Sequence, residues 1–261
     1  MNEQTIASIA QALCDAEKSS LTIEKLSVAY PGITVEDAYK IQLEAVKLKE
    51  KQGQVIVGKK IGLTNLVMQK AMGITEPDYG HVMDANMAAQ DVPLSMSTLV
   101  RPSIEAEIAF VLGRDIKGPG ITAATVMAAA EGILASFEIV DCRFHDSKIA
   151  LADTIADNAS CGRIILGSRM IPLEGIDLRT IGLVLEKNGT IIDMGVSAAV
   201  LGSPAASVAW LANKIASFGV YLKAGEVIMS GSFTNIHPIS AGDNFTAHFG
   251  GVGSVKASFV E

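Results

Sequence analysis

Glu105 and Glu107 stand two residues apart inside the apolar run of residues 102–112. A β-strand has a side-chain period of two, so a strand here places both carboxylates on one face, with Ile104 and Ile108 on the opposite, buried face. Two like charges about 7 Å apart repel by about 2 kcal/mol at an effective dielectric of about 20. A shared proton, a basic neighbour or a divalent cation offsets such repulsion. We favour the cation, while a strand face that is simply charged and solvated stays open.

A third carboxylate, Glu138, lies in the middle of another apolar run, residues 133–143. Oxygen ligands without a supporting cluster of histidine or cysteine indicate Mg²⁺ or Mn²⁺ rather than zinc. The four histidines are scattered and lack the spacing of a zinc-binding helix. On the residues alone, both interpretations of the glutamates remain open.

Two further residues could move protons. Lys60 follows an apolar strand, and a lysine desolvated near a cation can have a lowered pKa and act as a base or donor. A solvated lysine at a strand end is the alternative. Asp78, between Pro77 and Tyr79, is either a general acid or a turn former, and its turn chemistry favours the second.

Two polar, small-residue segments could bind a substrate. Ser160 lies in residues 157–162, which suit a loop that donates hydrogen bonds, and Thr234 ends a similar segment, residues 231–234. Such segments also occur as plain turns, so the pattern alone does not decide between the two interpretations.

The elements that must position these residues follow from periodicity and turn signals. Helices are predicted over residues 5–18, 35–52, 65–72, 122–132 and 204–219, the short third one ending at Gly73. Strands are predicted over residues 55–63, 103–113, 133–143, 181–187, 190–196, 226–230, 244–249 and 253–260, with a turn at 76–80. The pattern predicts a mixed α+β fold with a β-rich core, comprising an N-terminal helical region (1–75) packed on a β-rich catalytic domain (76–261) as one functional unit.

Composition limits the class of protein. The chain has 261 residues, 49% of them hydrophobic and 19% charged, enough for one large core. A net charge of −7 argues against nucleic acid or an anionic membrane as partner. Three cysteines without CxxC spacing predict reduced thiols. The N-terminus lacks signal-peptide features, and the longest uncharged stretch, residues 195–213, is interrupted by glycine and proline. We therefore expect a soluble, cytoplasmic protein.

Segments along nearly the whole chain resemble, in their order, the 2-oxopent-4-enoate (2-hydroxypenta-2,4-dienoate) hydratase family of the fumarylacetoacetate hydrolase superfamily. These segments are Gly58-Lys-Lys-Ile-Gly-Leu-Thr64, Glu76-Pro-Asp-Tyr-Gly80, Pro102-Ser-Ile-Glu-Ala-Glu-Ile108, Phe137-Glu-Ile-Val-Asp141, Ala156-Asp-Asn-Ala-Ser-Cys-Gly162, Val208-Ala-Trp-Leu-Ala-Asn213, Gly225-Glu-Val-Ile-Met-Ser-Gly231 and Gly251-Val-Gly-Ser254.

The resemblance implies a mixed sheet curled around a metal site, and a homo-oligomer built from pentameric rings. It implies that Mg²⁺ or Mn²⁺ is held by residues matching Glu105, Glu107 and Glu138. It also matches Lys60 to an active-site lysine and Asp78 to a nearby acid.

In this resemblance Ser160 falls in the loop that binds the carboxylate and oxo end of the substrate. The implied reaction belongs to the meta-cleavage degradation of aromatic compounds. It is the addition of water to 2-hydroxypenta-2,4-dienoate, which gives 4-hydroxy-2-oxopentanoate. A divalent cation suits this chemistry because it chelates the carboxylate and the neighbouring oxygen.

Three alternatives remain. The related 4-oxalocrotonate decarboxylases share the glutamates, and hydratases of longer diacids such as 2-oxohept-3-enedioate need an extra cation, for which Arg143 or Lys148 could serve. A non-catalytic subunit that stabilises a paired hydratase or decarboxylase is the third. Carbon–carbon bond hydrolysis is disfavoured because the chain has no His-x-x-Glu motif.

Overall fold

The structure, a computed structural model, describes residues 1–72, 74–145 and 149–261. Its α-helices are α1 (Glu3–Ser19), α2 (Leu26–Ala29), α3 (Val35–Lys51), α4 (Leu66–Met72), α5 (Ala123–Ala129), α6 (Leu151–Ala156) and α7 (Pro204–Ala216). Its strands are β1 (Ile56–Gly62), β2 (Asp78–Met83), β3 (Met87–Ala88), β4 (Leu94–Ser95), β5 (Pro102–Leu112), β6 (Ala130–Asp141), β7 (Cys161–Leu166), β8 (Gly182–Lys187), β9 (Thr190–Val196), β10 (Val227–Met229), β11 (His237–Pro238), β12 (Asn244–Phe249) and β13 (Gly253–Val260). Short 3₁₀ turns are η1 (Asp84–Asn86), η2 (Met96–Thr98), η3 (Asn158–Ser160) and η4 (Ser197–Ala199).

The strands of the described residues form two sheets. The larger has the order β2-β1-β10-β5-β6-β7-β3 with β11 added beside β5, and it mixes parallel with antiparallel pairs. The smaller has the order β4-β13-β12-β8-β9. Although β2 and β7 are far apart in the larger sheet, they contact each other. Buried residues from β2, β5, β7 and β10 form one small cluster. The larger sheet is therefore curled, as predicted.

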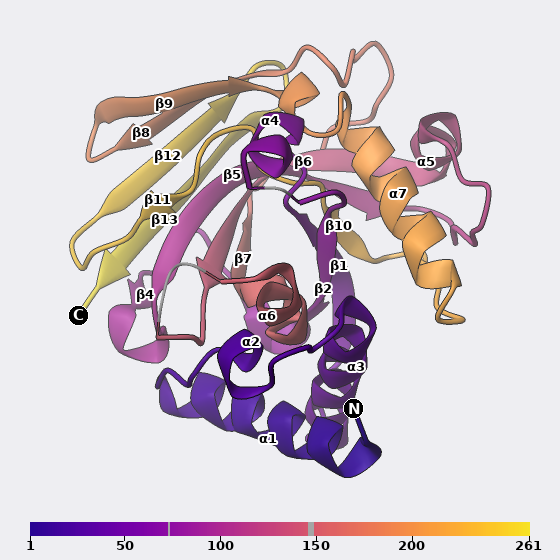
Figure 1. The fold of residues 1–261 in the computed structure, drawn as a ribbon. Coiled ribbons are helices and arrows are strands. Elements are labelled where there is room, and N and C mark those ends of the chain that lie inside the picture. The colour runs from indigo at the N-terminus through magenta and orange to yellow at the C-terminus, as the bar shows by residue number, and fades with distance from the viewer. Residues whose placement is uncertain (73, 146–148) are drawn as a thin grey trace.

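One continuous core joins these layers. It runs from Ile6 and Ile41 in the N-terminal helices, through Phe110 of β5, to Phe245 of the smaller sheet. Figure 1 shows α1, α2 and α3 gathered at one end, the smaller sheet on one side, and α5 and α7 on the other. The β1 strand, which precedes residue 76, belongs to the larger sheet.

Local sequence signals explain several boundaries. Thr34 and Asp37 form the capping box that starts α3. The predicted hairpin is confirmed, with β8 and β9 on either side of the Asn188-Gly189 turn. The helix predicted over 122–132 ends at Ala129, because the chain there enters the long β6 strand, whose pairing with β5 outweighs local helix propensity.

The predicted turn at residues 76–80 is wrong in part, since Asp78 begins the fully buried β2 strand. Pairing of β2 with β1 supplies hydrogen bonds that local turn chemistry does not reveal. Gly73, the expected end of the fourth helix, lies outside the described residues. No helix in the described part of the chain is long and apolar enough to cross a membrane.

Candidate metal and substrate site

Three carboxylates converge on the inner face of the curled sheet. Glu105 of β5 lies directly opposite Glu138 of β6, and Glu107 follows two residues along β5 on the same face. One oxygen from each side chain can be chosen so that all three lie within 4.8 Å of one another. Glu107 and Glu138 are 0% exposed. The predicted common face is confirmed, and the interpretation as a charged, solvated strand face is wrong.

Burial raises the pKa of all three carboxyl groups, because a charge in the protein interior loses its hydration. Repulsion from Glu138 and Glu105 raises the pKa of Glu107 further. Burial raises the pKa of Glu138 to about 7, although the nearby Lys60 ammonium acts against the rise. One lysine does not neutralise three carboxylates of which two are fully buried, so the site calls for additional positive charge.

The donor set fits a hard divalent cation. Among the described residues, Glu107 Oε1 and Glu138 Oε2 are buried without a hydrogen-bond partner, and Glu138 Oε1 has only the ion pair with Lys60. The remaining Glu107 oxygen accepts a 2.7 Å hydrogen bond from the Gly231 N–H. A side chain at position 231 would overlap Thr64, and its φ is +110°, so glycine is required there. Buried carboxylate oxygens that are free and converge are the ligands that Mg²⁺ and Mn²⁺ prefer.

Lys60 lies at the edge of this cluster. Its Nζ is buried, 3.1 Å from Glu138 Oε1, and donates a 2.8 Å hydrogen bond to the Ala159 carbonyl oxygen. Burial acts to lower the pKa of Lys60, but the charges of Glu138, Asp78 and Glu105 outweigh it and raise that pKa above its ordinary value. Beside these carboxylates Lys60 is held as an ammonium, and its part in proton transfer next to a bound cation stays a prediction.

Asp78 faces Lys60 from the neighbouring strand. It pairs with Gly62 in the register of β1 and β2, and its Oδ2 accepts a 2.8 Å hydrogen bond from the Thr154 hydroxyl. Its Oδ1 is buried and has no hydrogen-bond partner among the described residues. A Cβ on Gly62 would collide with this oxygen and lie 3.2 Å from Lys60 Nζ. The glycine therefore allows the carboxylate and the ammonium to lie close together.

Ser160 and Thr234 line the same cavity. The Ser160 hydroxyl donates a 3.1 Å hydrogen bond to Asp157, while the Thr234 hydroxyl oxygen is buried and has no partner within the described chain. A free hydroxyl in a cavity wall can donate a hydrogen bond to a bound anion. The structure thus brings both predicted substrate-binding residues to the site.

The cavity has a volume of about 460 Å³ and lies beside Glu105, Lys60 and Asp78. Most of the remaining wall is apolar, including Ile61, Leu63, Ile74, Val140, Ile149, Leu151 and Ile236. A volume and lining of this kind suit a small organic acid. The polar end offers a cation site, a fixed ammonium and a free carboxylate oxygen, which together can polarise an oxo acid and move its protons.

A buried arginine anchors the loop that carries Ser160. Asn158, Ala159 and Ser160 all have left-handed backbone angles, with φ between 50° and 55°, which is strained for residues other than glycine. Arg143 donates to the Asp157 side chain at 2.6 Å and to the Asp157 main-chain oxygen at 2.6 Å. These contacts to Asp157 hold the adjoining strained segment, residues 158–160, in place.

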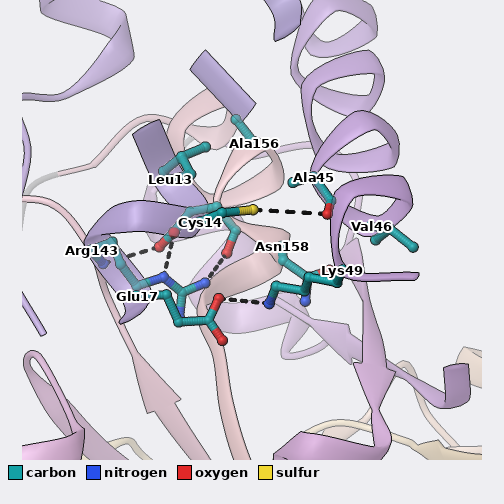
Figure 2. A pocket seen from close by; sticks show the side chains of 10 residues that line it. Leu13, Cys14, Glu17, Ala45, Val46, Lys49, Arg143, Ala156 and Asn158 are labelled. Atoms are coloured by element: carbon teal, nitrogen blue, oxygen red, sulfur yellow. Dashed lines mark hydrogen bonds and ion pairs between the residues drawn. The ribbon is translucent and has the colours of Figure 1, made fainter. Parts of the chain in front are cut away.

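Figure 2 shows this anchor, with Arg143 among residues of α1 and α3 beside the Glu17–Lys49 ion pair. The adjoining crevice has a volume of about 20 Å³, room for about one water molecule. Arg143 is therefore a structural residue, and its predicted role as a cation for a distant substrate carboxylate is wrong. Lys148, the other residue considered for that role, lies outside the described residues.

Comparison with known proteins now identifies the family. The family model described as "Fumarylacetoacetate (FAA) hydrolase C-terminal" matches residues 68–260, well over half of the chain. The chain belongs to the fumarylacetoacetate hydrolase family. The predicted resemblance and fold class are thereby confirmed.

Relatives within the fumarylacetoacetate hydrolase family differ in the reaction for which they are named. The 2-hydroxyhexa-2,4-dienoate hydratase of Comamonas testosteroni is 41% identical over 263 residues, covering 100% of this chain and 99% of that protein. The 4-oxalocrotonate decarboxylase of Pseudomonas putida is also 41% identical, over 260 residues, covering 100% of this chain and 98% of that protein.

The solved structure of one relative has the same fold over the whole of this chain. The 4-oxalocrotonate decarboxylase from Pseudomonas putida G7, complexed with magnesium and adipate, has a TM-score of 0.97 and 39% identity, and the match covers 100% of this chain and 99% of that one. Both kinds of relative are lyases, so this member of the fumarylacetoacetate hydrolase family is a lyase that uses a divalent cation.

Sequence reasoning missed two residues of the site. Thr154 bonds to Asp78, and Arg101 lines the cavity. Thr154 lies 76 residues from Asp78 along the chain, so no local pattern signals the contact. Arg101 did carry a signal, because the alternation that pairs Glu105 with Glu107 extends back through Ser103 to Arg101.

Proposed function

We propose that this chain is a divalent-metal-dependent hydratase that adds water to 2-hydroxypenta-2,4-dienoate and forms 4-hydroxy-2-oxopentanoate. The observation that carries the proposal is the converging trio of Glu105, Glu107 and Glu138, two of them fully buried and with unpartnered oxygens, beside a cavity that also holds Lys60 and Asp78. The hydratase among the similar relatives supports the choice of a dienoate substrate.

In this proposal the three glutamates hold Mg²⁺ or Mn²⁺ at the polar end of the cavity. The bound cation acts as a Lewis acid that stabilises negative charge on a 2-oxo acid. Ser160 and Thr234 bind and orient the carboxylate and oxo end of the substrate. The apolar wall excludes water from the chain of carbons, apart from the water that reacts.

Lys60 and Asp78 move protons in two stages. First, the enol hydroxyl loses its proton and carbon 5 gains one, which gives the conjugated 2-oxo acid. Then the oxygen of water adds to carbon 4, and carbon 3 gains a proton. The free Oδ1 of Asp78 accepts a proton from water, and the Lys60 ammonium donates a hydrogen bond to the oxygen on which charge develops.

Decarboxylation of 4-oxalocrotonate is the second candidate function. It is supported by a decarboxylase at 41% identity and by the agreement of the fold with a solved decarboxylase. The same oxo acid end would then serve as the electron sink for loss of carbon dioxide. Hydration of a longer diacid such as 2-oxohept-3-enedioate, or a role as partner subunit of a paired enzyme, are the remaining options.

Product analysis tests the proposal. Purified protein with Mg²⁺ is mixed with freshly generated 2-hydroxypenta-2,4-dienoate and, separately, with 4-oxalocrotonate, and the products are identified by proton NMR. We expect 4-hydroxy-2-oxopentanoate from the first substrate. Carbon dioxide release from 4-oxalocrotonate, without hydration of the dienoate, would establish the decarboxylase instead. No reaction with either substrate would favour the role of partner subunit.

We also propose that the chain forms a homo-oligomer in the cytoplasm, as a pentamer or a decamer of two pentameric rings, and that it associates with a paired decarboxylase or hydratase. The edge strand β9 supports self-association, because Ile191, Met194 and Val196 expose large apolar side chains there. All three cysteines are free thiols, as a reducing compartment permits. We also propose residues 1–75 as an N-terminal region, helical apart from β1, that packs on a catalytic domain of residues 76–261. Light scattering of the purified protein tests the subunit number.

A further inference from the structure

The side chain of Gln42, in helix α3, joins two main-chain segments behind the cavity. Gln42 is 0% exposed, and its Nε2 donates one hydrogen bond of 2.8 Å to the Tyr79 carbonyl oxygen and another of 2.8 Å to the Ile155 carbonyl oxygen. Both N–H groups of the amide are thereby used. The reversed amide would place its oxygen against two carbonyl oxygens, so the surroundings fix the orientation of Gln42.

The two acceptors directly follow the two residues of a hydrogen-bonded pair. Tyr79 follows Asp78 in β2, and Ile155 follows Thr154 in α6. The Thr154 hydroxyl donates to Asp78 Oδ2 at 2.8 Å, while Asp78 Oδ1 has no partner among the described residues. A single amide therefore sets the separation of the two main chains that carry this pair.

The β2 strand depends on side chains for its position, because it is the last strand of the larger sheet in the described chain. The outer edge of such a strand presents main-chain groups that no further strand can bond. Gln42 bonds one of them, and Asn158 bonds both the N–H and the carbonyl oxygen of His81, at 2.7 and 2.8 Å. The ring of Tyr39, three residues before Gln42, stacks on the ring of Tyr79 with centroids 4.7 Å apart. Helix α3 thus fixes the start of β2 by a hydrogen bond and a ring contact.

A second contact ties α6 to the N-terminal helices. Asp153 is 0% exposed, and its carboxylate accepts hydrogen bonds from the N–H of Ser27 at 2.8 Å and from the Ser27 hydroxyl at 2.7 Å. Ser27 belongs to α2. These bonds place α6 against α2, whereas Gln42 bonds to α6 and to β2 at once.

We infer that Gln42 is a positioning residue for Asp78, holding β2 and α6 at the separation at which Thr154 binds one carboxylate oxygen and leaves the other free. Asp78 has its part in proton transfer from the proposed function, on which this inference rests. Misplacing a reacting group by about 1 Å can lower a rate by about a hundredfold. Gln42 is uncharged, so it acts on Asp78 through position. The N-terminal helices thereby contribute to the reaction as well as to the core.

Kinetics of Gln42→Met with Mg²⁺ and 2-hydroxypenta-2,4-dienoate test the inference. Methionine is about as large as glutamine but donates no hydrogen bond. We expect kcat to fall by about tenfold to a hundredfold while KM changes by less than about twofold. Gln42→Asn keeps the amide on a shorter side chain, should lose less kcat, and replaces Gln42→Met if that variant does not fold.

Asn213→Leu is the matched control. The Asn213 amide also bonds twice to the main chain, donating to the Ile121 carbonyl oxygen at 2.9 Å and accepting from the Ile121 N–H at 2.9 Å. The described lining of the cavity includes neither residue. Losing these two bonds should therefore leave kcat within about twofold of the unmodified chain.

A double-mutant cycle separates positioning from general damage to packing. Thr154→Val removes the hydrogen bond to Asp78 Oδ2 while keeping the shape of the side chain. If Gln42 acts through this bond, adding Gln42→Met to Thr154→Val should lower kcat further by less than about twofold. An equal loss with and without Thr154→Val would overturn the inference, and so would an unchanged kcat in Gln42→Met.

A second reaction distinguishes failure of the inference from failure of the proposed function. If the dienoate is hydrated and the cycle is additive, the inference fails and the proposed function stands. If the dienoate is not hydrated, the proposed function fails, and the same cycle is measured on 2-oxopentanoate in D₂O by proton NMR. There carbon 3 loses a proton to the protein and gains a deuteron from solvent. Exchange that depends on Gln42 only while Thr154 is present would support the inference, and absence of exchange in the unmodified chain would overturn it.

Discussion

Glu105 and Glu138 face each other across β5 and β6, two antiparallel strands that also carry Glu107 on the same inner face. Directly opposed side chains in such a pair lie close together, and like charges there destabilise a sheet. A divalent cation held by these carboxylates would offset their repulsion, which explains how the fold accommodates the pairing.

Replacing Glu107 by Gln removes one ligand and one negative charge while keeping the size of the side chain. We expect metal-dependent turnover of the dienoate to fall by at least about a thousandfold, because the Lewis acid is lost or misplaced. Loss of dienol absorbance under saturating Mg²⁺ measures this. Near-normal activity of the variant without added cation would contradict the proposed role of the trio.

Stability without metal should fall as the pH rises from about 4.5 to about 7. Burial holds the pKa of Glu138 at about 7 in the folded protein, above its ordinary value of 4.5. The folded state then binds more protons than the unfolded state in this window, so raising the pH favours unfolding, by about 3 kcal/mol across the window. Chemical denaturation with EDTA at a series of pH values measures the fall.

Divalent cation should remove most of this pH dependence. Asp157, whose pKa burial raises to about 6 despite Arg143, contributes in the same direction but lies behind the site. The difference between the stability–pH curves measured with EDTA and with Mg²⁺ therefore gives the contribution of the three glutamates alone. Identical curves would show that the cation does not bind at the trio.

Lys60→Met should lower kcat by about a hundredfold to ten-thousandfold, the usual range for a lost proton-transfer group. Cation binding should persist, because the three glutamates remain. The double variant Lys59→Met/Glu226→Gln is a matched control, since it removes the neighbouring buried ion pair of 2.8 Å. A comparable loss of kcat in that control would show that the effect of Lys60→Met comes from damaged packing.

Arg143→Lys should destabilise the folded protein by about 3 kcal/mol, because lysine cannot replace the fork of bonds that holds Asp157. Turnover should fall as the strained segment of residues 158–160 loses its anchor, while Mn²⁺ affinity stays the same. Arg163→Lys, a half-buried arginine bonded at 3.1 Å to the adjacent Gly162 carbonyl, is the control and should change stability by less than about 1 kcal/mol. Equal losses in both variants would argue against a special role for Arg143.

The two-residue side-chain period of a strand was enough to predict the face shared by Glu105 and Glu107. The Asn188-Gly189 turn signal was enough to predict the hairpin. They could not predict that Glu138 lies opposite Glu105, because strand register is set by contacts distant in sequence. Asp78 was predicted in a turn because Pro77 and Asp78 also suit a turn, and only pairing with β1 makes this residue the start of a buried strand.

The two arginines show the same limit. Arg143 and Arg101 both lie close to the glutamates in sequence, and the sequence offered Arg143 or Lys148 as the cation for a second carboxylate. The structure buries Arg143 against Asp157 and places Arg101 in the cavity wall. Which side of a strand end faces a cavity depends on how the sheet curls, which no short pattern encodes.

Binding of Mn²⁺ measured by electron paramagnetic resonance tests the central claim most directly. The unmodified chain should bind one Mn²⁺ per subunit, displaced by Mg²⁺, and Glu138→Gln should weaken that binding by at least about tenfold. Equal stoichiometry and affinity in the unmodified chain and in Glu138→Gln would show that the cation binds elsewhere. This result would contradict the proposal that the three glutamates hold the cation.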